Sequence, residues 1–394
     1  MSIPLIVCAS TQYWDETWFR KQHFMKRLSQ HRPVLYVEPS RSILRPPRQG
    51  TPPTLRNPPF TSRLRTLQAG RLWTYTPPRG WPLWTHRRVS PLQYDAWGRA
   101  VRLTARDLGF ERVWLWLYNP LWIQSTASLA PERVIFDLVD DLTAYDAGAH
   151  TRETMRVCVE RALTESDLVF TTSKLLAETH ASRTREGKMH VVSNGVPADW
   201  LSLEIDELPP QLAALPRPRI GFVGAVFSYL DADLLVATAR AFRGGSLVVV
   251  GPVHDETMAA RLRAEPNTHL LGAWPQARVP EAIAGFDVAL SPFRAGAVRR
   301  AVNPLKVYEY LALGKPVVST PLESLRGEPI ADSIRMAEST PEFVRAIREA
   351  LAQDNPAARM ARRRAVAPYT WDALGEQVER ILEASDLSRE GERA

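Results

Sequence analysis

The chain has 394 residues, more than one typical hydrophobic core accommodates, so we expect two domains. Its apolar fraction of 45% and charged fraction of 24% are those of a globular protein and exclude the disordered and fibrous classes. The two cysteines, Cys8 and Cys158, have neither metal-ligand spacing nor the number of a disulfide framework, which favours a reducing compartment. The formal net charge of +7 is informative mainly through its distribution along the chain.

The first apolar run, residues 3–9, is short and is followed at once by Trp14, Asp15 and Glu16. It lacks a preceding basic region, so we interpret it as a first strand and not as a signal peptide. No later run approaches the roughly 18 apolar residues that a membrane-spanning helix requires. We therefore expect a cytoplasmic protein, with attachment to the inner face of the cytoplasmic membrane as an alternative.

Residues 39–94 form an excursion rich in Arg, Pro and Trp that contains no acidic residue. Basic residues near anionic phospholipid contribute about 1 kcal/mol each, and Trp prefers the interface, so an anionic membrane surface is one candidate partner. A solvated, proline-rich segment is the alternative. We expect no nucleic-acid partner, because no nucleic-acid-binding motif accompanies the charge.

Short β-rich runs alternate with helical patterns along the chain, which indicates βαβ units and parallel sheets. In residues 151–164 the apolar positions follow the spacing of one buried helical stripe. We expect a first domain over residues 1–201, a linker over 202–218, a second α/β domain over 219–368, and a final helix in 369–394 that packs on the first domain. Two such domains would face a cleft lined by the carboxyl ends of both sheets. The expected strands are residues 3–8, 34–37, 112–117, 133–136, 168–171, 190–192, 219–223, 246–250, 269–271, 287–291 and 316–319.

The segment Asn303–Val318, NPLKVYEYLALGKPVV, has clear helix boundaries. Asn303 is a good N-cap, Pro304 a good first helical residue, and Gly314 a good stop. A helix N-terminus directed into a cleft suits a diphosphate, and Lys306 in the first turn would add a full positive charge. Glu309 follows on the same helix face. On spacing alone, a plain amphipathic helix with a surface Lys–Glu pair is the favoured interpretation.

This segment resembles the donor-binding helix of bacterial glycosyltransferases of the "glycosyl transferases group 1" type. Similar segments occur in the same order elsewhere in the chain: SDLVFTTSKLL, VVSNGVP, IGFVGAV, LLGAWPQARVPEAIAGFDVALSPF and YTWD. The resemblance implies the GT-B fold, two Rossmann-like parallel α/β domains that face a central cleft. It also implies a metal-independent mechanism without a cofactor, in which a UDP- or GDP-linked sugar is the donor substrate.

The resemblance further implies roles for residues of the second domain. Lys306 would contact the diphosphate and Glu309 the ribose, while Gly224 would let the backbone approach the phosphates. The segment Trp274–Val279 would hold the base. Additional phosphate-binding candidates are Arg294, Arg299 and Arg300.

One position departs from the pattern of the family. Retaining members carry a second glutamate eight positions before the residue equivalent to Glu309, and Ala301 occupies that position here. Asn303 could take over part of the contact with the donor sugar. The sequence therefore leaves open whether the reaction retains or inverts configuration.

An acidic cluster, FDLVDDLTAYD, follows a strand of the first domain. Asp140 and Asp141, and behind them Asp137, are the candidate catalytic residues, because a carboxylate at the cleft could deprotonate the acceptor hydroxyl or orient the acceptor. A Mg²⁺ site is an alternative, but no second ligand cluster completes it, so we expect no metal. Helix capping and solvation are the simplest explanation for at least one of the three.

The loop and helix after the first strand supply candidate acceptor residues. These are Trp14, Arg20 and His23, since this loop faces the acceptor in GT-B enzymes. His23 as a general base competes with a structural role.

The sequence thus predicts transfer of a hexose or related sugar to a glycan or polyprenyl-linked acceptor, in the synthesis of a bacterial surface polysaccharide. Two alternatives remain open: a sugar-nucleotide epimerase on the same fold, and a nucleotide-sugar-binding protein without turnover.

Overall fold

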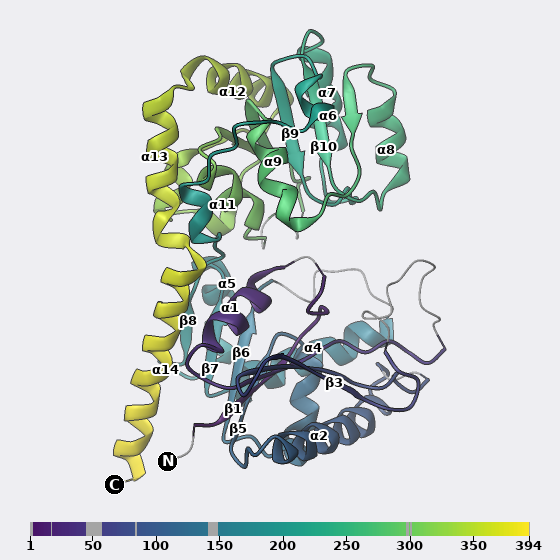
Figure 1. Cartoon of the computed structure of the whole chain (residues 1–394), viewed down its shortest axis with the longest axis vertical. Coiled ribbons are helices and arrows are strands. Elements are labelled where there is room, and N and C mark those ends of the chain that lie inside the picture. Colours follow the sequence, from purple (N-terminus) through teal and green to yellow (C-terminus); the bar gives the residue numbers. More distant parts are fainter. Residues whose placement is uncertain are drawn as a thin grey trace. The chain divides into compact units, whose positions relative to one another are not determined.

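The computed structural model describes residues 3–16, 18–44, 57–82, 85–140, 149–296, 299 and 302–393 (Figure 1). The chain forms two compact units, one of residues 1–192 with 375–394 and the other of residues 193–374. The first boundary therefore falls before residue 201, and residues 202–218 belong to the second unit instead of forming a free linker.

Unit 1 is built around an eight-stranded sheet in the order β3-β4-β2-β1-β5-β6-β7-β8. Its strands are β1 (Leu5–Ala9), β2 (Val34–Val37), β3 (Arg63–Gln68), β4 (Leu72–Thr76), β5 (Val113–Leu117), β6 (Arg133–Leu138), β7 (Leu168–Thr171) and β8 (Met189–Val191). Its helices are α1 (Arg20–Leu28), α2 (Ser90–Asp107), α3 (Thr126–Leu129), α4 (Ala149–Glu165) and α5 (Lys174–His180). The last helix, α14 (Trp371–Arg393), belongs to unit 1 from Gly375 onward.

Part of the predicted excursion at residues 39–94 is regular structure. Strand β4 pairs in parallel with β2, and β3 pairs antiparallel with β4, so together they extend the sheet. Trp73, which we had assigned to a membrane-facing segment, is 6% exposed and packs in the core of unit 1. Each arginine of β3 has a partner: Arg63 donates to Thr76 Oγ1, and Arg65 forms an ion pair with Asp15.

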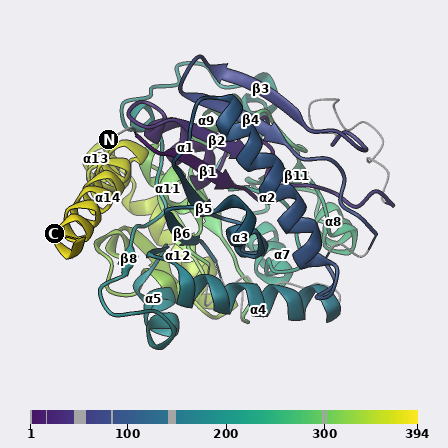
Figure 2. The ribbon, with the colours of Figure 1, turned by 90° about the horizontal axis from the view of Figure 1, so that it is seen from below.

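One face of this sheet is covered by α2, α3 and α4 (Figure 2). The predicted apolar stripe of α4 is confirmed, because Cys158, Val159, Ala162 and Leu163 are all buried against the sheet. The strands contribute alternate residues to this core, as the two-residue side-chain period of a strand requires.

Helix α14 runs beside α1 and β8 in unit 1 (Figure 1). Val378 and Leu382 are fully buried. Gln377 donates to the Val191 carbonyl at 3.1 Å, and the buried Arg133 of β6 binds the Ser385 carbonyl and the Asp386 carboxylate. The final helix thus completes the core of the first unit.

Unit 2 contains a fully parallel six-stranded sheet in the order β11-β10-β9-β12-β13-β14. Its strands are β9 (Arg219–Val223), β10 (Ser246–Val250), β11 (Thr268–Leu270), β12 (Val288–Ser291), β13 (Val317–Ser319) and β14 (Ile334–Met336). Its helices are α6 (Pro210–Ala213), α7 (Ala232–Ala241), α8 (Glu256–Arg263), α9 (Val279–Ala284), α11 (Leu305–Ala312), α12 (Thr340–Gln353) and α13 (Pro356–Val366). Strand β14 was missed because it has only three residues, of which Arg335 is charged and Met336 is 37% exposed.

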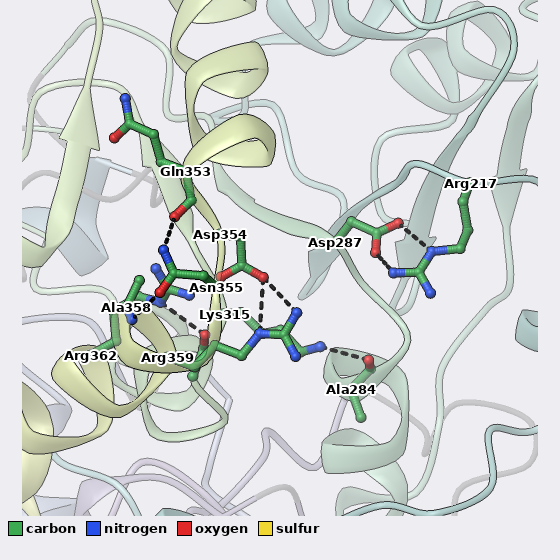
Figure 3. Close-up of polar contacts among 11 residues, drawn as sticks. Arg217, Ala284, Asp287, Lys315, Gln353, Asp354, Asn355, Ala358, Arg359 and Arg362 are labelled. Carbon is green, nitrogen blue, oxygen red and sulfur yellow. Dashed lines mark hydrogen bonds and ion pairs between the residues drawn. The ribbon is translucent and has the colours of Figure 1, made fainter.

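Polar side chains form hydrogen bonds and ion pairs near the amino ends of β12 and β13 (Figure 3). Lys315 donates to the Ala284 carbonyl at the end of α9, at 2.7 Å. Arg217 pairs with Asp287, and Asp354 binds both Arg359 and Arg362 of α13. These contacts fix the edge of the sheet opposite to its carboxyl ends, where the candidate site lies.

Candidate active site

Helix α11 carries the predicted donor-binding side chains of unit 2. It begins one residue later than predicted, since Pro304 occupies the cap position in an extended conformation. Asn303 is therefore not the cap. Its side-chain amide donates to Ser193 Oγ at 3.2 Å, and its backbone carbonyl accepts from Asn194 Nδ2 at 2.8 Å. Asn303 is buried, which favours a role in fixing the start of α11 over the predicted contact with a sugar.

The end of α11 is as predicted. Gly314 adopts a φ of +70°, a left-handed conformation that favours glycine. The following N–H of Lys315 donates to the Tyr310 carbonyl at 2.9 Å, which closes the helix. The Tyr310 hydroxyl accepts from the Val223 N–H at 2.8 Å and so holds α11 against the end of β9.

Lys306 lies at the point where the strand order of the unit 2 sheet reverses. Strands β9 and β12 are neighbours there, and open α/β sheets bind ligands outside the carboxyl ends of such a pair. The Lys306 amine is 5.5 Å from the ring centroid of Phe222 in β9 and 5.7 Å from that of Phe293 after β12. Lys306, the residue predicted to bind the diphosphate, thus lies at the expected edge of the sheet.

Gly224 lies directly beside this lysine. A Cβ atom at Gly224 would be 3.0 Å from Lys306 Cε and 3.4 Å from Nζ. On the other side, a Cβ atom at Gly251 would lie 2.0 Å from the Gly224 carbonyl oxygen. Two backbone turns therefore meet here with no room for side chains, so the backbone itself borders the space beside the lysine. The N–H groups of Gly224 and Gly251 are not open to a ligand, because they donate to the Val250 and Gly272 carbonyls at 2.9 and 2.8 Å.

Lys306 and Glu309 are half-buried and affect each other electrostatically. Burial lowers the pKa of Lys306, and the nearby Glu309 carboxylate opposes this shift. Burial likewise raises the pKa of Glu309, and Lys306 opposes that shift. Within the described part of the chain, the Lys306 amine makes no hydrogen bond and no ion pair. An anion at this position would therefore meet a cation that the protein itself does not neutralise closely.

The other predicted donor residues lie on neighbouring loops of unit 2. Trp274, on the loop after β11, is half-buried and has the Arg278 guanidinium 5.0 Å from its ring centroid. Arg294 follows β12 with an exposed side chain, and its N–H donates to the Tyr229 carbonyl. Arg299 forms an ion pair with Glu338, with Nη2 3.0 Å from Oε1. Arg300 and Ala301 lie outside the described residues.

In unit 1, Arg20 and Asp137 form a buried ion pair. Arg20 Nε is 3.0 Å from Asp137 Oδ1, and Arg20 Nη1 donates to the Val192 carbonyl at 2.7 Å. The side chains are 3% and 0% exposed. The Asp137 carboxylate is buried and occupied by the Arg20 guanidinium, so the geometry favours a positioning role for both residues over the predicted catalytic and acceptor roles.

Asp140 is half-buried and lies two residues after the end of β6. Asp141 lies outside the described residues. A lysine that we did not predict, Lys21 of α1, is close enough to Asp140 for their charges to interact. The Lys21 amine donates to Thr11 Oγ1 at 2.5 Å and lies 5.7 Å from the Tyr118 ring centroid.

Thr11 follows β1 and Tyr118 follows β5, so Lys21 marks the point where the strand order of the unit 1 sheet reverses. Burial lowers the pKa of Lys21 to about 8. The sequence feature that could have identified Lys21 is its position next to Arg20, at the start of the first helix after the first strand.

The remaining acceptor candidates are both packed among aromatic rings. Trp14 is 7% exposed, and its N–H donates to Glu38 Oε1 at 3.1 Å. His23 is half-buried with its ring 5.3 Å from that of Trp18. Burial, with a smaller contribution from Lys26, lowers the pKa of His23 to about 4. So low a pKa makes His23 a weak base and speaks against its use as the general base.

The described residues contain neither a metal-binding cluster nor a membrane-spanning helix. No group of three or more His, Cys, Asp or Glu side chains is arranged to hold a metal ion in that part of the chain. No described helix is long and apolar enough to cross a membrane.

Two α/β units, each with a largely parallel sheet, and with a lysine, a glutamate and a glycine turn at the reversal point of the second sheet, form the GT-B fold. Residues 217–353, which lie within unit 2, match the family described as glycosyl transferases group 1, and the chain is a glycosyltransferase. A Bacillus subtilis (strain 168) protein, provisionally named the teichuronic acid biosynthesis glycosyltransferase TuaH, is 25% identical over 291 residues, which cover 70% of this chain and 73% of that protein.

Solved structures agree on the fold. An α,α-trehalose-phosphate synthase (UDP-forming) from Burkholderia xenovorans is similar with a TM-score of 0.67 and 13% identity, over 96% of this chain and 100% of that chain. Sucrose-phosphate synthase from Thermosynechococcus elongatus gives a TM-score of 0.68 and 15% identity, over 98% and 100%. An Escherichia coli protein of trehalose-6-phosphate metabolism, bound with UDP-2-fluoro glucose, gives 0.65 and 12%, over 96% and 98%. The match of residues 217–353 to glycosyl transferases group 1 favours the transferase over the epimerase and the binding protein without turnover.

Proposed function

We propose that the protein transfers a sugar from a nucleoside diphosphate sugar to a glycan or polyprenyl-linked acceptor, in the synthesis of a bacterial surface polysaccharide. The observation that carries the donor assignment is the half-buried Lys306 amine beside the Gly224 turn, at the reversal point of the unit 2 sheet. Lys306 would hold the diphosphate, the Gly224 turn would let it approach the backbone closely, and Glu309 would accept hydrogen bonds from the ribose.

Among the predicted UDP- and GDP-linked donors we favour UDP. Two of the solved structures described above are named for UDP formation or for a bound UDP-sugar analogue. The acceptor side is supported by the name of the Bacillus relative, which places that protein in the synthesis of a cell-surface polymer. In this proposal Asp140 is the residue that deprotonates or orients the acceptor hydroxyl, and no metal ion takes part.

The protein would work at the inner face of the cytoplasmic membrane. The described part of residues 39–94 supports this through exposed apolar side chains: Leu44, Phe60 and Trp81 are 69%, 81% and 47% exposed. Arg87 and Arg88 are exposed close to Trp81 in the chain. Exposed aromatic residues with nearby arginines suit the interface of an anionic membrane.

The donor assignment predicts that UDP raises the melting temperature of the wild-type chain and not that of Lys306→Ala. A ligand at 100 times its Kd stabilises by about 2.7 kcal/mol, which corresponds to a shift of a few degrees for a domain of this size. The measurement is a thermal shift with UDP, GDP, dTDP and their glucose conjugates, each variant being compared with its own ligand-free state.

The matched control is Lys315→Ala. Lys315 is also a partly buried lysine of unit 2 whose pKa burial lowers, to about 8, but it lies at the amino ends of the strands (Figure 3). The UDP shift should persist in this variant. The donor assignment fails if no nucleotide stabilises the wild type, or if Lys306→Ala keeps the shift.

A further inference from the structure

A cavity of about 340 Å³ lies in unit 2 near the amino ends of the sheet strands, away from the candidate donor site. It is lined by Ala284 at the end of α9, by Leu313 and Lys315 after α11, by α13, and by residues 203–205. We call this cavity the Lys315 pocket, and part of its lining is drawn in Figure 3. Its volume lies in the range of about 300–1,000 Å³ that is typical of small-molecule sites.

The Lys315 amine lines this pocket without a close counter-ion. It donates to the Ala284 carbonyl at 2.7 Å, which uses one of its three N–H donors, and it forms no ion pair with a carboxylate of the described residues. Burial and the nearby Arg359 guanidinium lower the pKa of Lys315 to about 8, and Asp287 and Asp354 oppose this shift only in part. Two cations that repel each other therefore line one cavity, and an anion between them would relieve the repulsion.

The two arginines of the pocket can also contact a ligand. Arg359 Nε and Nη2 both donate to Asp354 Oδ2, at 2.9 and 2.7 Å, which leaves its Nη1 group without a hydrogen bond among the described residues. Arg363 donates to Glu204 Oε1 at 2.8 Å, but the Glu204 side chain is 73% exposed. An ion pair so open to solvent is weak, so a ligand can replace Glu204 at little cost.

The charge of the lining indicates the chemistry of the occupant. Lys315, Arg359 and Arg363, with Glu204 as the one acidic residue of the lining, give a net charge of +2. A phosphate monoester carries a charge of about −1.5 to −2 at pH 7, whereas a single carboxylate would compensate only half of the lining. Guanidinium and ammonium groups both bind phosphate oxygens. The rest of the lining is largely apolar and suits an organic substituent: Leu203, Ile205, Leu313, Pro356 and Met360.

We propose that the Lys315 pocket binds a phosphate monoester whose organic part is small and largely apolar. The phosphate would lie between Lys315 and Arg359, and the organic part would contact Leu313 and Met360. This site is separate from the proposed donor site, since Lys315 follows the end of α11 whereas Lys306 lies in its first turn. The inference therefore does not depend on which sugar is transferred or on the acceptor.

The test titrates phenyl phosphate and inorganic phosphate into the full chain carrying Lys306→Ala, by calorimetry, so that the donor site does not contribute. We expect phenyl phosphate to bind once per chain and more tightly than inorganic phosphate, because its ring would contact the apolar part of the lining. Adding Arg359→Gln or Lys315→Met should raise the Kd of phenyl phosphate about tenfold or more, since each removes a hydrogen bond to a charged group. The Arg359 side chain is 57% exposed, so Arg359→Gln decides the test if Lys315→Met fails to fold.

The matched control is Arg364→Gln, which removes an exposed arginine of the same helix that does not line the pocket. It should leave the Kd unchanged. The inference is overturned if phenyl phosphate does not bind, if Arg359→Gln leaves its Kd unchanged, or if Arg364→Gln raises the Kd as much as Arg359→Gln does. Equal affinities for phenyl phosphate and inorganic phosphate would overturn the assignment of the organic part. Failure of UDP to stabilise the wild type would overturn the donor assignment alone.

Discussion

Lys21 is the residue of unit 1 whose environment departs most from what its sequence position indicates. An amphipathic helix after a strand commonly carries solvated lysines, yet Lys21 is 7% exposed and bound to Thr11. Burial disfavours its charged form, while Asp140, Asp137 and Glu16 favour it. The charge of the Lys21 amine therefore changes with pH just above neutrality. This amine interacts with Asp140, the candidate base.

Lys21 should make the stability of the protein depend on pH in alkaline solution. Its pKa is about 8 in the folded chain and 10.5 when unperturbed, so between these values the unfolded state binds more protons and stability rises with pH. The free energy of unfolding of the wild type, minus that of Lys21→Met, should increase by about 3 kcal/mol between pH 8 and 10.5. Urea unfolding across this range measures the difference.

Subtracting the variant removes the contributions of the other groups that titrate in the same range. Lys26→Met, an exposed lysine of the same helix, is the matched control, and its difference from the wild type should show no comparable rise. A constant difference for Lys21→Met would show that the buried amine does not titrate as its environment indicates.

The sequence was a better guide to which residues gather than to what each one does. Lys306, Glu309 and Gly224 were found because an ordered series of family-like segments places them on known elements. Arg20 and Asp137 were also brought to the right edge of their sheet, but they are 117 positions apart, and no local pattern shows that they bind each other. Contacts between distant residues, such as the stack of Phe227 on His254, depend on tertiary packing that spacing along the chain does not encode.

At the scale of elements, local patterns predicted most of the strands that are buried on both faces, with β4 as an exception. Strands β2, β7, β9 and β10 begin and end as predicted, because each is a short apolar run between turn residues. The hairpin of β3 and β4 was missed. Strand β3 alternates arginine with leucine and threonine, a pattern that also fits a basic surface segment, and only its pairing with β4 decides between them.

The hairpin region makes the membrane proposal testable. Phe60→Ser combined with Trp81→Ser removes two exposed aromatic side chains and should lower binding to vesicles of phosphatidylglycerol and phosphatidylcholine about tenfold or more. Partial insertion of two such side chains contributes about 2 kcal/mol. Flotation measures the bound fraction, and vesicles of phosphatidylcholine alone should bind the wild type weakly because they lack the anionic charge.

Leu103→Ser is the matched control for this experiment. Leu103 is 58% exposed on α2, outside the predicted membrane-facing residues, so its loss should not alter flotation. Equal flotation of the double variant and the wild type would remove the membrane surface from the proposed partners.

At the scale of the whole molecule, unit 1 is made of two segments that are separated in the sequence by the whole of unit 2. Unit 1 is completed only by residues 375–394, after the whole of unit 2 has been formed in sequence. The buried Arg133 shows the consequence for stability. Its side chain is 1% exposed, and two of its polar partners, the Ser385 carbonyl and the Asp386 carboxylate, come from α14. Removing one partner of a buried ion pair typically costs 3–5 kcal/mol, because a charge is left buried without compensation.

Truncation after Leu374 should therefore destabilise unit 1 and spare unit 2. Besides the partners of Arg133, it removes the buried side chains of Val378 and Leu382, each worth about 1.5–3 kcal/mol on full burial. Calorimetry should show the melting transition of unit 1 lowered by ten degrees or more, or absent, while a second transition that UDP shifts upward remains. Truncation after Leu387, which keeps Val378, Leu382 and Asp386, is the matched control and should melt nearly as the full chain does. If the chain cut after Leu374 keeps both transitions at their full-length temperatures, α14 is not part of the core of unit 1. If the cut instead abolishes the UDP-shifted transition as well, the two units do not fold independently, and their stabilities must be treated as one.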